Sequence, residues 1–428
     1  MMLSLKLPIV ILGQGLSGSA VEKYLSHCGY VRGKDFFIYD QKDGSDFQST
    51  DQVLKLQPQT AFLSPGIPGQ SKWIQQLEQN GCWITNEWSL AYSLLTTEKV
   101  IAVTGSVGKS TTTALLQQGL RWDPHAFVGG NFGIPFLDYI TAIQFLNQPK
   151  AKWVVLELSS YQLERFPHFS PQISVVTSLL PNHLERYDSL EQYYQVKLDG
   201  ISQTQDFIIA NRNGGDLFSF SKNHSSFFSE ILWTDGQDPE WKDAGFKDSR
   251  LVGLHNQDNL AMAALVAKKA GWPSDSLLWM KEFSGLPHRM EYLGLHLGIH
   301  GINDSKATTV QSVLTCVESL NHDSRFQNKH LLLGGRDKNL PWQQLNALSS
   351  LSGWSFYFFG EAAQRIASAS GLTGKTYARL KDAVDAAKMS AQPGDLLLLS
   401  PGGTSLDEFK NFEDRGDQFR NYFFRTNY

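Results

Sequence analysis

Short apolar runs alternate with longer amphipathic stretches over the first hundred residues of the chain. Four runs predict buried strands: PIVIL (8–12), DFFIYD (35–40), TAFLSPGIP (60–68) and CWITNEW (82–88). The stretch SGSAVEKYLSHCG (17–29) has the spacing of a helix. Strands that alternate with helices predict a parallel sheet, because the crossover between parallel strands is long enough to hold a helix.

The same pattern begins again at KVIAVTG (99–105). Further buried strands are predicted at KWVVLELSS (152–160), ISVVTSLL (173–180) and DFIIAN (206–211). Helices are predicted at SLEQYYQVKLDGI (189–201) and at LHNQDNLAMAALVAKKAG (254–271), which ends on a glycine cap. Residues 216–250 have no clear period, and loops and short strands are expected there.

A third series of strands starts after about residue 287. Its members end in glycine turns: KHLLLGGRD (329–337), WSFYFFG (354–360) and DLLLLSPGG (395–403). A chain of 428 residues is too long for one hydrophobic core. The sequence therefore predicts an α/β protein of three domains, with bounds at 1–97, 98–286 and 287–428.

Composition and charge narrow the class of protein. Hydrophobic residues make up 41% and charged residues 19% of the chain, and the net charge of −4 argues against binding to nucleic acid or to an anionic membrane surface. Cys28, Cys82 and Cys316 lie far apart and form no CxxC pair, which suits packing roles in a reducing compartment. No apolar run reaches the roughly 18 residues of a membrane span, and the first apolar stretch is too short for a signal peptide. We expect a cytoplasmic protein.

A glycine turn follows the strand that begins the second series. It reads Gly105-Ser106-Val107-Gly108-Lys109-Ser110-Thr111 and precedes a predicted helix. Glycines let a backbone approach phosphate oxygens, the helix N-terminus favours negative charge, and Lys109 and Ser110 can reach phosphates and Mg²⁺. Val103 stands where the full phosphate-loop motif has its first glycine. The alternative is a plain glycine turn with a surface lysine.

Two further residues follow strands of the same series. Glu157 ends the predicted strand 152–160, and a carboxylate at a strand's carboxyl end beside a phosphate loop is a natural Mg²⁺ ligand. His183 follows the next strand and could ligate a second cation or contact substrate. A solvated strand-end acid and a polar loop histidine are the alternatives.

The first series carries a second glycine turn. Gly13-x-Gly15-x-x-Gly18 with Asp40 has the spacing of about 20 residues typical of a dinucleotide fingerprint. The same pattern fits a single nucleotide diphosphate equally well. A tight strand–helix turn without a ligand also remains open.

The third series gathers polar residues after its strands. The window Asn303-Asp304-Ser305-Lys306-Ala307-Thr308 follows His288-Arg289, and Lys338 and Ser405 follow glycine turns. An arginine offers a planar fork for phosphate or carboxylate, and glycine turns with Lys and Ser suit a carboxylate ligand. Ordinary loop chemistry is the alternative for each.

Taken together, these motifs resemble those of the Mur ligases of peptidoglycan synthesis, and within that family they are most similar to the members that add D-glutamate. The resemblance covers nearly the whole chain in order: ILGQGLSG, SPGIP, TGSVGKSTTT, GGNFGIP, ELSSYQLE, NHLERY, HNQDN, LPHRMEY, INDSKATT, LLLGGRDKN and SPGGTSLDEFKNFEDRG. It implies a Rossmann-like N-terminal unit for the UDP substrate, a central P-loop-type ATPase domain, and a Rossmann-like C-terminal domain for the amino acid.

The resemblance also implies an activity: ATP-dependent addition of D-glutamate to UDP-N-acetylmuramoyl-L-alanine through an acyl phosphate, in peptidoglycan precursor synthesis. ATP and Mg²⁺ are the implied cofactors, and the protein is expected to be a monomer that binds neither nucleic acid nor membrane. Another amide ligase of the superfamily, similar to folylpolyglutamate synthase, is one alternative. A nucleotide-binding regulator without catalysis is the other.

Residue roles follow from the resemblance motif by motif. Catalysis is assigned to Lys109, Glu157, His183 and Lys197, the last in the place of a carbamylated lysine, and the metal to Ser110, Glu157, His183 and carbamylated Lys197. ATP is assigned to Gly105, Ser106, Val107, Gly108, Lys109, Ser110, Thr111, Asn256, Asn259, Arg289 and Asp304. The UDP substrate is assigned to Leu16, Ser17, Asp40, Asn131, Ser159 and Gln162, and D-glutamate to Lys306, Thr308, Lys338, Ser405 and Phe412.

Overall fold

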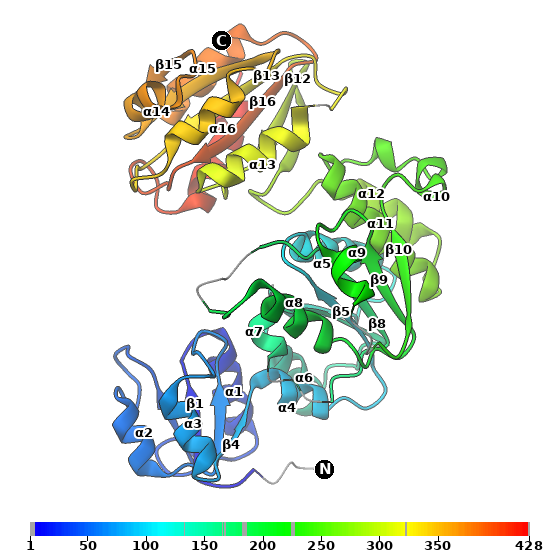
Figure 1. The fold of residues 1–428 in the computed structure, drawn as a ribbon, viewed down its shortest axis with the longest axis vertical. Coiled ribbons are helices and arrows are strands. Elements are labelled where there is room, and N and C mark those ends of the chain that lie inside the picture. Colours follow the sequence, from blue (N-terminus) through cyan, green and yellow to red (C-terminus); the bar gives the residue numbers. More distant parts are fainter. Residues whose placement is uncertain are drawn as a thin grey trace. The chain divides into compact units, whose positions relative to one another are not determined.

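The computed structural model describes residues 5–131, 133–164, 166, 168–181, 186–223, 227–321 and 323–426, apart from the side chain of Lys247 (Figure 1). The described residues contain three sheets, within residues 9–85, 99–234 and 291–402. They pack as two compact units: residues 1–235 with 261–277, and residues 236–260 with 278–428. The α/β class is confirmed, and the three predicted domain boundaries stay a prediction.

The first sheet is parallel throughout and has the strand order β2-β1-β3-β4. Its strands are β1 (Ile9–Leu12), β2 (Phe36–Tyr39), β3 (Thr60–Leu63) and β4 (Trp83–Thr85), with helices α1 (Leu16–His27), α2 (Thr50–Leu56) and α3 (Lys72–Gln79) between them. The predicted strand 82–88 ends early because the Asn86 side chain accepts a hydrogen bond from Ser89 N (2.8 Å) and so caps helix α4 (Glu87–Ser93).

The second sheet is also parallel, in the order β10-β9-β8-β5-β7-β6. Its strands are β5 (Lys99–Thr104), β6 (Phe127–Gly130), β7 (Trp153–Glu157), β8 (Ile173–Val176), β9 (Phe207–Asn211) and β10 (Glu230–Thr234). The helices are α5 (Lys109–Gly119), α6 (Phe136–Phe145), α7 (Ser160–Leu163), α8 (Leu190–Asp199), α11 (Leu254–Lys269) and α12 (Asp275–Glu282).

The prediction of loops and short strands over 216–250 is wrong in part. One strand, β10, forms there, but α9 (Leu217–Lys222), α10 (Pro239–Asp243) and the 3₁₀ turn η1 (Phe246–Asp248) are helical. Each is shorter than two full α-helical turns, so it offers too few apolar positions for a helical period to be visible in the sequence.

The third sheet has the order β11-β12-β16-β13-β14-β15. Its strands are β11 (Glu291–His296), β12 (Ile299–Asn303), β13 (Lys329–Gly334), β14 (Trp354–Phe359), β15 (Gly374–Tyr377) and β16 (Leu396–Gly402). Only the hairpin β11–β12 is antiparallel. One face packs on α13 (Val310–Asn321), η2 (Trp342–Leu348) and α14 (Ala363–Ser370), and the other on α15 (Leu380–Ser390) and α16 (Phe412–Phe424).

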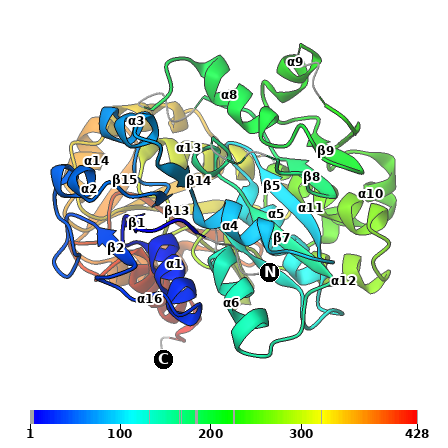
Figure 2. The ribbon, with the colours of Figure 1, turned by 90° about the horizontal axis from the view of Figure 1, so that it is seen from below.

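The first two sheets share a hydrophobic core. Helix α1 lies beside α6, as Figure 2 shows, and residues of both helices belong to one buried cluster. The Tyr24 ring meets Phe145 edge-on at 5.9 Å between centroids, and its hydroxyl donates to Gln144 Oε1 (3.2 Å). The first and second sheets therefore belong to one packed body.

The cysteine side chains and the apolar character of the helices can be compared with the expected packing roles and the expected lack of a membrane span. Cys82 and Cys316 are buried and Cys28 is half-buried, and all three are free thiols, as packing roles require. Among the helices of the described residues, none has both the length and the apolar character needed to cross a membrane.

A buried carboxyl group caps helix α6 from another helix. Glu87, at the start of α4, accepts a hydrogen bond from Leu137 N in the first turn of α6, whose own N-cap Pro135 supplies no side-chain bond. Glu87 is 2% exposed, and its second oxygen has no partner among the described residues. Burial raises the pKa of Glu87 to about 8.

This raised pKa predicts a pH-dependent stability. Between about pH 4.5 and 8 the folded state keeps the Glu87 proton that the unfolded state loses, so stability should fall as pH rises, by up to about 1.4 kcal/mol per pH unit. Glu87→Gln keeps an acceptor for Leu137 N and cannot ionise. Denaturant midpoints at pH 6, 7 and 8 should show this variant gaining on the wild type as pH rises. A constant difference across the three pH values would contradict the assignment.

Candidate active site

The carboxyl ends of four neighbouring strands carry the central site. Strands β8, β5, β7 and β6 are adjacent and parallel, so the loops that follow them meet at one edge of the sheet. The turn after β5 needs both of its glycines. Gly105 has φ +140°, and a Cβ there would lie 2.1 Å from Thr177 Oγ1, while Gly108 has φ +88° as the N-cap of α5.

This turn presents the N-terminus of α5 together with a lysine. The first N–H groups of a helix have no partner within the helix, and they attract an anion. Lys109 folds back over the turn, and its Nζ donates to Gly105 O (2.9 Å) and Ser106 O (3.1 Å). Ser110 and Thr111, in the same helical turn, are half-buried. The sequence-predicted phosphate loop is therefore built as a strand–turn–helix.

Hydrogen bonds to residues after β8 hold two members of the predicted loop. The Ser106 hydroxyl donates to Leu180 O (3.0 Å) and accepts from Leu180 N (2.9 Å) and from the Tyr193 hydroxyl (3.2 Å). Val107 N donates to Ser178 Oγ (3.0 Å), although the Val107 side chain is exposed. The Ser106 side chain thus anchors the turn, and sequence reasoning missed the anchoring residues, which lie after β8 and on α8.

Glu157 lies at the end of β7, opposite Val103 of β5 and Gly130 of β6. It is 1% exposed, and Oε1 accepts a hydrogen bond from Asn131 Nδ2 (2.8 Å). Oε2 is buried without a partner among the described residues. A buried, unpartnered carboxylate oxygen beside a phosphate loop fits a cation ligand.

The other expected metal ligands are only partly in view. Ser110 lies in the first turn of α5, and His183 lies outside the described residues. Within the described ranges no group of three His, Cys, Asp or Glu side chains could hold a metal by itself. The donors that do fit a cation are therefore Glu157 and Ser110, and the remaining ligands would come from phosphate oxygens, water or a modified lysine.

Lys197 reaches the phosphate loop from helix α8. Its side chain is 1% exposed, and Nζ donates to Gly105 O (3.0 Å), the same carbonyl that Lys109 binds. The ammonium also lies 4.8 Å from the centroid of the Tyr193 ring. Burial lowers the pKa of Lys197 well below its ordinary value, and the positive charge of Lys109 adds to this effect.

The glycine turn of the first sheet lies at the switch point of the strand order, between β1 and β3. Gly13 has φ +97°, and a Cβ on Gly18 would stand 1.9 Å from Gly13 O, so the fold requires both. Gly15 differs, because its φ of −78° suits any residue and a Cβ there would meet nothing within 4 Å. The fold therefore does not require a glycine at position 15, and the close approach of a ligand to the backbone is the reason that remains.

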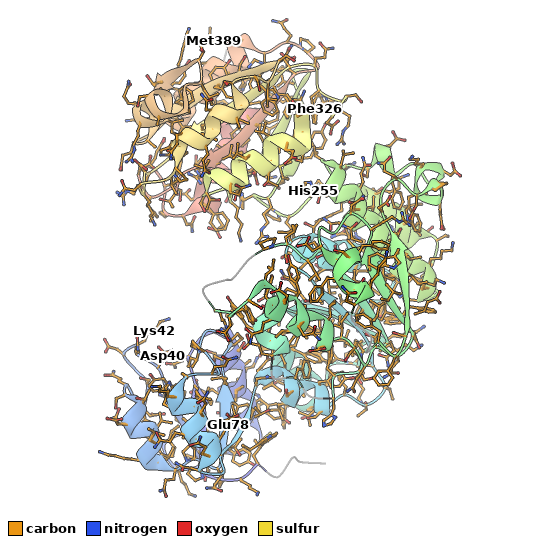
Figure 3. The ribbon with its side chains drawn as sticks, in the orientation of Figure 1. Asp40, Lys42, Glu78, His255, Phe326 and Met389 are labelled. Carbon is orange, nitrogen blue, oxygen red and sulfur yellow. The ribbon has the colours of Figure 1, made fainter. Side chains whose placement is uncertain are left out.

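Asp40 closes this turn from the end of β2. Its Oδ2 accepts a hydrogen bond from Gln14 N (2.6 Å) and its Oδ1 from Lys42 N (3.1 Å). Figure 3 shows Asp40 and Lys42 in the loop that follows β2. The Gln14 amide is the chief cause that lowers the pKa of Asp40. Leu16 is 75% exposed and Ser17 half-buried at the start of α1. Three of the six residues expected at UDP, Leu16, Ser17 and Asp40, therefore lie at one edge of the first sheet.

Ser159 and Gln162 have a structural role of their own. Ser159 is the N-cap of α7, and its hydroxyl and backbone N–H each pair with the Gln162 side chain in a capping box. Asn131, assigned to the same substrate, holds Glu157. These contacts leave the assigned ligand roles untested.

Arg186, which sequence reasoning missed, joins the first sheet to the second by a hydrogen bond and forms a salt bridge within the second segment. Arg186 donates to Pro65 O (3.0 Å) in the loop after β3 and to Glu164 Oε2 (2.9 Å), and its guanidinium lies 3.8 Å from the centroid of Tyr161. These residues line a small pocket together with Ser64, Ile67, Asn86, Trp88 and Gln162. The pocket opens beside the Gly13 turn, since Ser64 Oγ donates to Gly13 O (3.1 Å).

The residues assigned to D-glutamate lie on loops of the third sheet. Lys306, after β12, places Nζ 5.1 Å from the centroid of Phe412 at the start of α16. Ser405, after β16, is 3% exposed, whereas Lys338, after β13, is exposed and Thr308 is half-buried. Strands β12, β16 and β13 are neighbours, so these loops share one edge of the sheet.

The remaining ATP candidates lie in the second compact unit. Asn256 and Asn259 are buried on α11 and bond to each other (3.1 Å), and Asn256 also donates to Val252 O (2.7 Å). Arg289 is exposed. Asp304 accepts from Ser400 Oγ (2.8 Å) and Met290 N (3.2 Å), and burial raises its pKa to about 6.

Comparison with known proteins places the chain. The Mur ligase middle domain family matches residues 103–267. A UDP-N-acetylmuramoylalanine–D-glutamate ligase of Symbiobacterium thermophilum is 33% identical over 389 residues, which cover 84% of this chain and 82% of that protein. The chain belongs to this ligase family.

A second ligase sequence matches over more of this chain, and a solved structure shares its fold. A protein of the same name from Fervidobacterium nodosum is 29% identical over 426 residues, covering 96% of this chain and 97% of the relative. The UDP-N-acetylmuramate–alanine ligase of Thermotoga maritima shares the fold, with a TM-score of 0.54 and 17% identity over 97% of each chain. The matched middle domain contains the predicted phosphate loop, Glu157 and Lys197.

The glycine turn of this ligase yields a test that separates fold from ligand. Gly18→Ala forces a clash with Gly13 O and should cost about 1–3 kcal/mol of stability. Gly15→Ala should leave the free energy of unfolding within about 0.5 kcal/mol of the wild-type value, because its Cβ enters open space.

Binding of UDP, measured by isothermal titration calorimetry, should nevertheless weaken about tenfold or more in Gly15→Ala, because the added methyl group occupies the space of the ligand. Unchanged UDP affinity in that variant would exclude the turn as the uridine diphosphate site.

Proposed function

We propose that this protein joins D-glutamate to UDP-N-acetylmuramoyl-L-alanine with cleavage of ATP to ADP and phosphate, in cytoplasmic peptidoglycan precursor synthesis. The alanyl carboxylate attacks the γ-phosphorus, the bond to ADP breaks, and an acyl phosphate forms. The amine of D-glutamate then attacks the acyl carbon, a proton is lost, and phosphate leaves. The observation that carries the site is the meeting of Lys109 and Lys197 at Gly105, beside the buried Glu157.

The phosphate loop answers the main electrostatic problem of this reaction. A carboxylate and a triphosphate repel each other by about 4 kcal/mol per charge pair at about 4 Å and an effective dielectric constant of about 20. Lys109 and the N-terminus of α5 offset this repulsion at the place where the two anions must meet. Lys109 now bonds to loop carbonyls, and turning its Nζ outward exchanges those bonds for phosphate oxygens.

Glu157 and Ser110 are the residues proposed to hold Mg²⁺. The unpartnered Oε2 of Glu157 supplies a negative oxygen, and Asn131 fixes the carboxylate by its bond to Oε1. A bound Mg²⁺ would cancel negative charge on the phosphates and orient them. His183 belongs to the same proposal on the strength of its motif.

Lys197 is proposed to be carbamylated. Only a neutral amine attacks CO₂, and burial together with the charge of Lys109 favours the neutral form. The carbamate would turn a buried cation, 1% exposed and next to another lysine, into an anion able to ligate a metal. The electrostatic strain of two ammonium groups on one carbonyl is thereby relieved.

The three sheets divide the substrates among them in this proposal. The first domain (1–97) holds the uridine diphosphate through the Gly13 turn, Leu16, Ser17 and Asp40, with Asn131, Ser159 and Gln162 at the sugar side. The central domain (98–286) binds ATP through the phosphate loop, with Asn256 and Asn259. The third domain (287–428) supplies Arg289 and Asp304 to the nucleotide and the loops around Lys306 and Ser405 to D-glutamate. The protein is proposed to act as a monomer.

A panel of acceptors and amino acids tests the reaction. Phosphate release from ATP should require both UDP-N-acetylmuramoyl-L-alanine and D-glutamate, with little release for L-glutamate, D-glutamine or D-aspartate. Lys109→Ala should lower kcat about 100-fold or more with an unchanged unfolding midpoint, because the lysine acts on charge in the transition state.

Other outcomes of the panel point elsewhere. Release with a folate acceptor and L-glutamate would favour the folylpolyglutamate-synthase-like alternative. ATP binding without any substrate-dependent release would favour a regulator.

Carbamylation has a direct spectroscopic test. Protein equilibrated with ¹³C-bicarbonate should give one carbamate carbon signal that is absent from Lys197→Met and present in Lys222→Met, a surface lysine stacked on Phe218. The signal should fade as pH is lowered, because protonation of the amine competes with CO₂. Lys197→Met should also lose about 100-fold or more in kcat. A wild-type spectrum without the signal, in fully active protein, would sink the assignment.

A further inference from the structure

Arg415 is a buried cation, and no carboxylate among the described residues is hydrogen-bonded to it. It lies in the first turns of α16, its side chain is 0% exposed, and each of its three nitrogens donates one bond. Nε donates to Ser305 Oγ (3.0 Å), Nη2 to Ser305 O (2.8 Å) and Nη1 to Gly403 O (3.0 Å). All three acceptors are uncharged.

Such an arrangement is costly unless it serves a purpose. Burial lowers the pKa of Arg415 to about 10, against the opposing charges of Asp407 and Asp304, which do not bond to it among the described residues. The group stays protonated at neutral pH. A neutral, apolar side chain of similar volume would avoid the cost of burying a charge. What such a side chain cannot do is satisfy three acceptors on two separate loops.

The loops around this guanidinium are those that carry the amino-acid candidates. Ser305 precedes Lys306 in the loop after β12, and Gly403 lies two residues before Ser405 in the loop after β16. Ser305 Oγ also donates to Phe412 O (2.7 Å), which ties the start of α16 to the same point. Gly335, after β13, is close as well, since a Cβ there would lie 2.8 Å from Nη1.

We propose that Arg415 is a positioning residue for the amino-acid site, which fixes Lys306, Ser405 and Phe412 relative to one another. This inference rests on the proposed function, and it adds a residue that touches none of the substrates. The planar fork of an arginine matches the task, because three N–H groups in fixed directions set two loops and a helix end at once. A lysine has one nitrogen and cannot span the same acceptors.

A matched control lies on α15 and bonds to the opposite, C-terminal end of α16. Lys388 of α15 donates to Tyr422 O (3.1 Å), Phe423 O (3.0 Å) and Arg425 O. Like Arg415, it is a cation with three uncharged acceptors, but all three are backbone carbonyls of the α16 region. It lies away from the loops after β12 and β16. Loss of Lys388 should loosen α16 without disturbing those loops.

The experiment compares Arg415→Met, Arg415→Lys and Lys388→Met in steady-state kinetics with all three substrates varied in turn. Arg415→Met should raise KM for D-glutamate about 10- to 100-fold, with KM for ATP and for UDP-N-acetylmuramoyl-L-alanine within about twofold of the wild type. Arg415→Lys keeps the charge but has one nitrogen. The logarithm of its KM for D-glutamate should therefore lie closer to that of Arg415→Met than to that of the wild type. Lys388→Met should lower the unfolding midpoint and leave KM for D-glutamate unchanged.

The outcomes separate this inference from the proposed function. If wild-type protein releases no phosphate in response to D-glutamate, the proposed function fails. If the wild type is active and folded Arg415→Met keeps the wild-type KM for D-glutamate, or loses all three substrates equally, Arg415 is structural only and the inference is overturned. If Arg415→Met does not fold, the same comparison of KM values for the three substrates is made with Arg415→Lys, and the same outcomes support or overturn the inference.

Discussion

The carbonyl oxygen of Gly105 is the point on which the central site depends. Two lysines from different helices donate to it, Lys109 at 2.9 Å and Lys197 at 3.0 Å. The carbonyl can face both only because Gly105 adopts φ +140° and carries no side chain against Thr177. The strand, the turn, the helix that starts at Lys109 and the helix that brings Lys197 are therefore fixed relative to one another by a single peptide group.

Each sheet deals with charge at its carboxyl edge in a different way. The first places the anion Asp40 on a backbone amide of its own glycine turn, so that the turn is held in shape without a cation. The second combines a helix N-terminus with two lysines and the buried Glu157. The third buries a guanidinium, Arg415, behind its loops and leaves Lys306 at the surface. The three edges therefore carry three different arrangements of charge, which the proposed function assigns to three anionic substrates.

Sequence reasoning located strands and turns well and supporting contacts poorly. The run before Gly105 and the glycine spacing after it determine a strand–turn–helix locally, so they could be read without knowledge of the fold. The anchors of Ser106 and Val107 come from residues 178, 180 and 193, and no local pattern in the sequence predicts them. The capping box of Ser159 and Gln162 does have a local signal, S-x-x-Q, although the family resemblance assigns both residues to a ligand. Arg415 could be recognised only once three loops had met around it.

The bond between Lys197 and Gly105 limits what the lysine can become. It requires one N–H on Nζ, and an ammonium, a neutral amine and a carbamate nitrogen each have at least one. Modification therefore need not disturb the phosphate loop. What it removes is the attraction of the ammonium for the Tyr193 ring, worth about 0.5–2 kcal/mol, and the repulsion from Lys109, whose charge already opposes a second cation. Under the proposed carbamylation, the site would therefore keep its geometry while the charge on Lys197 changes from positive to negative.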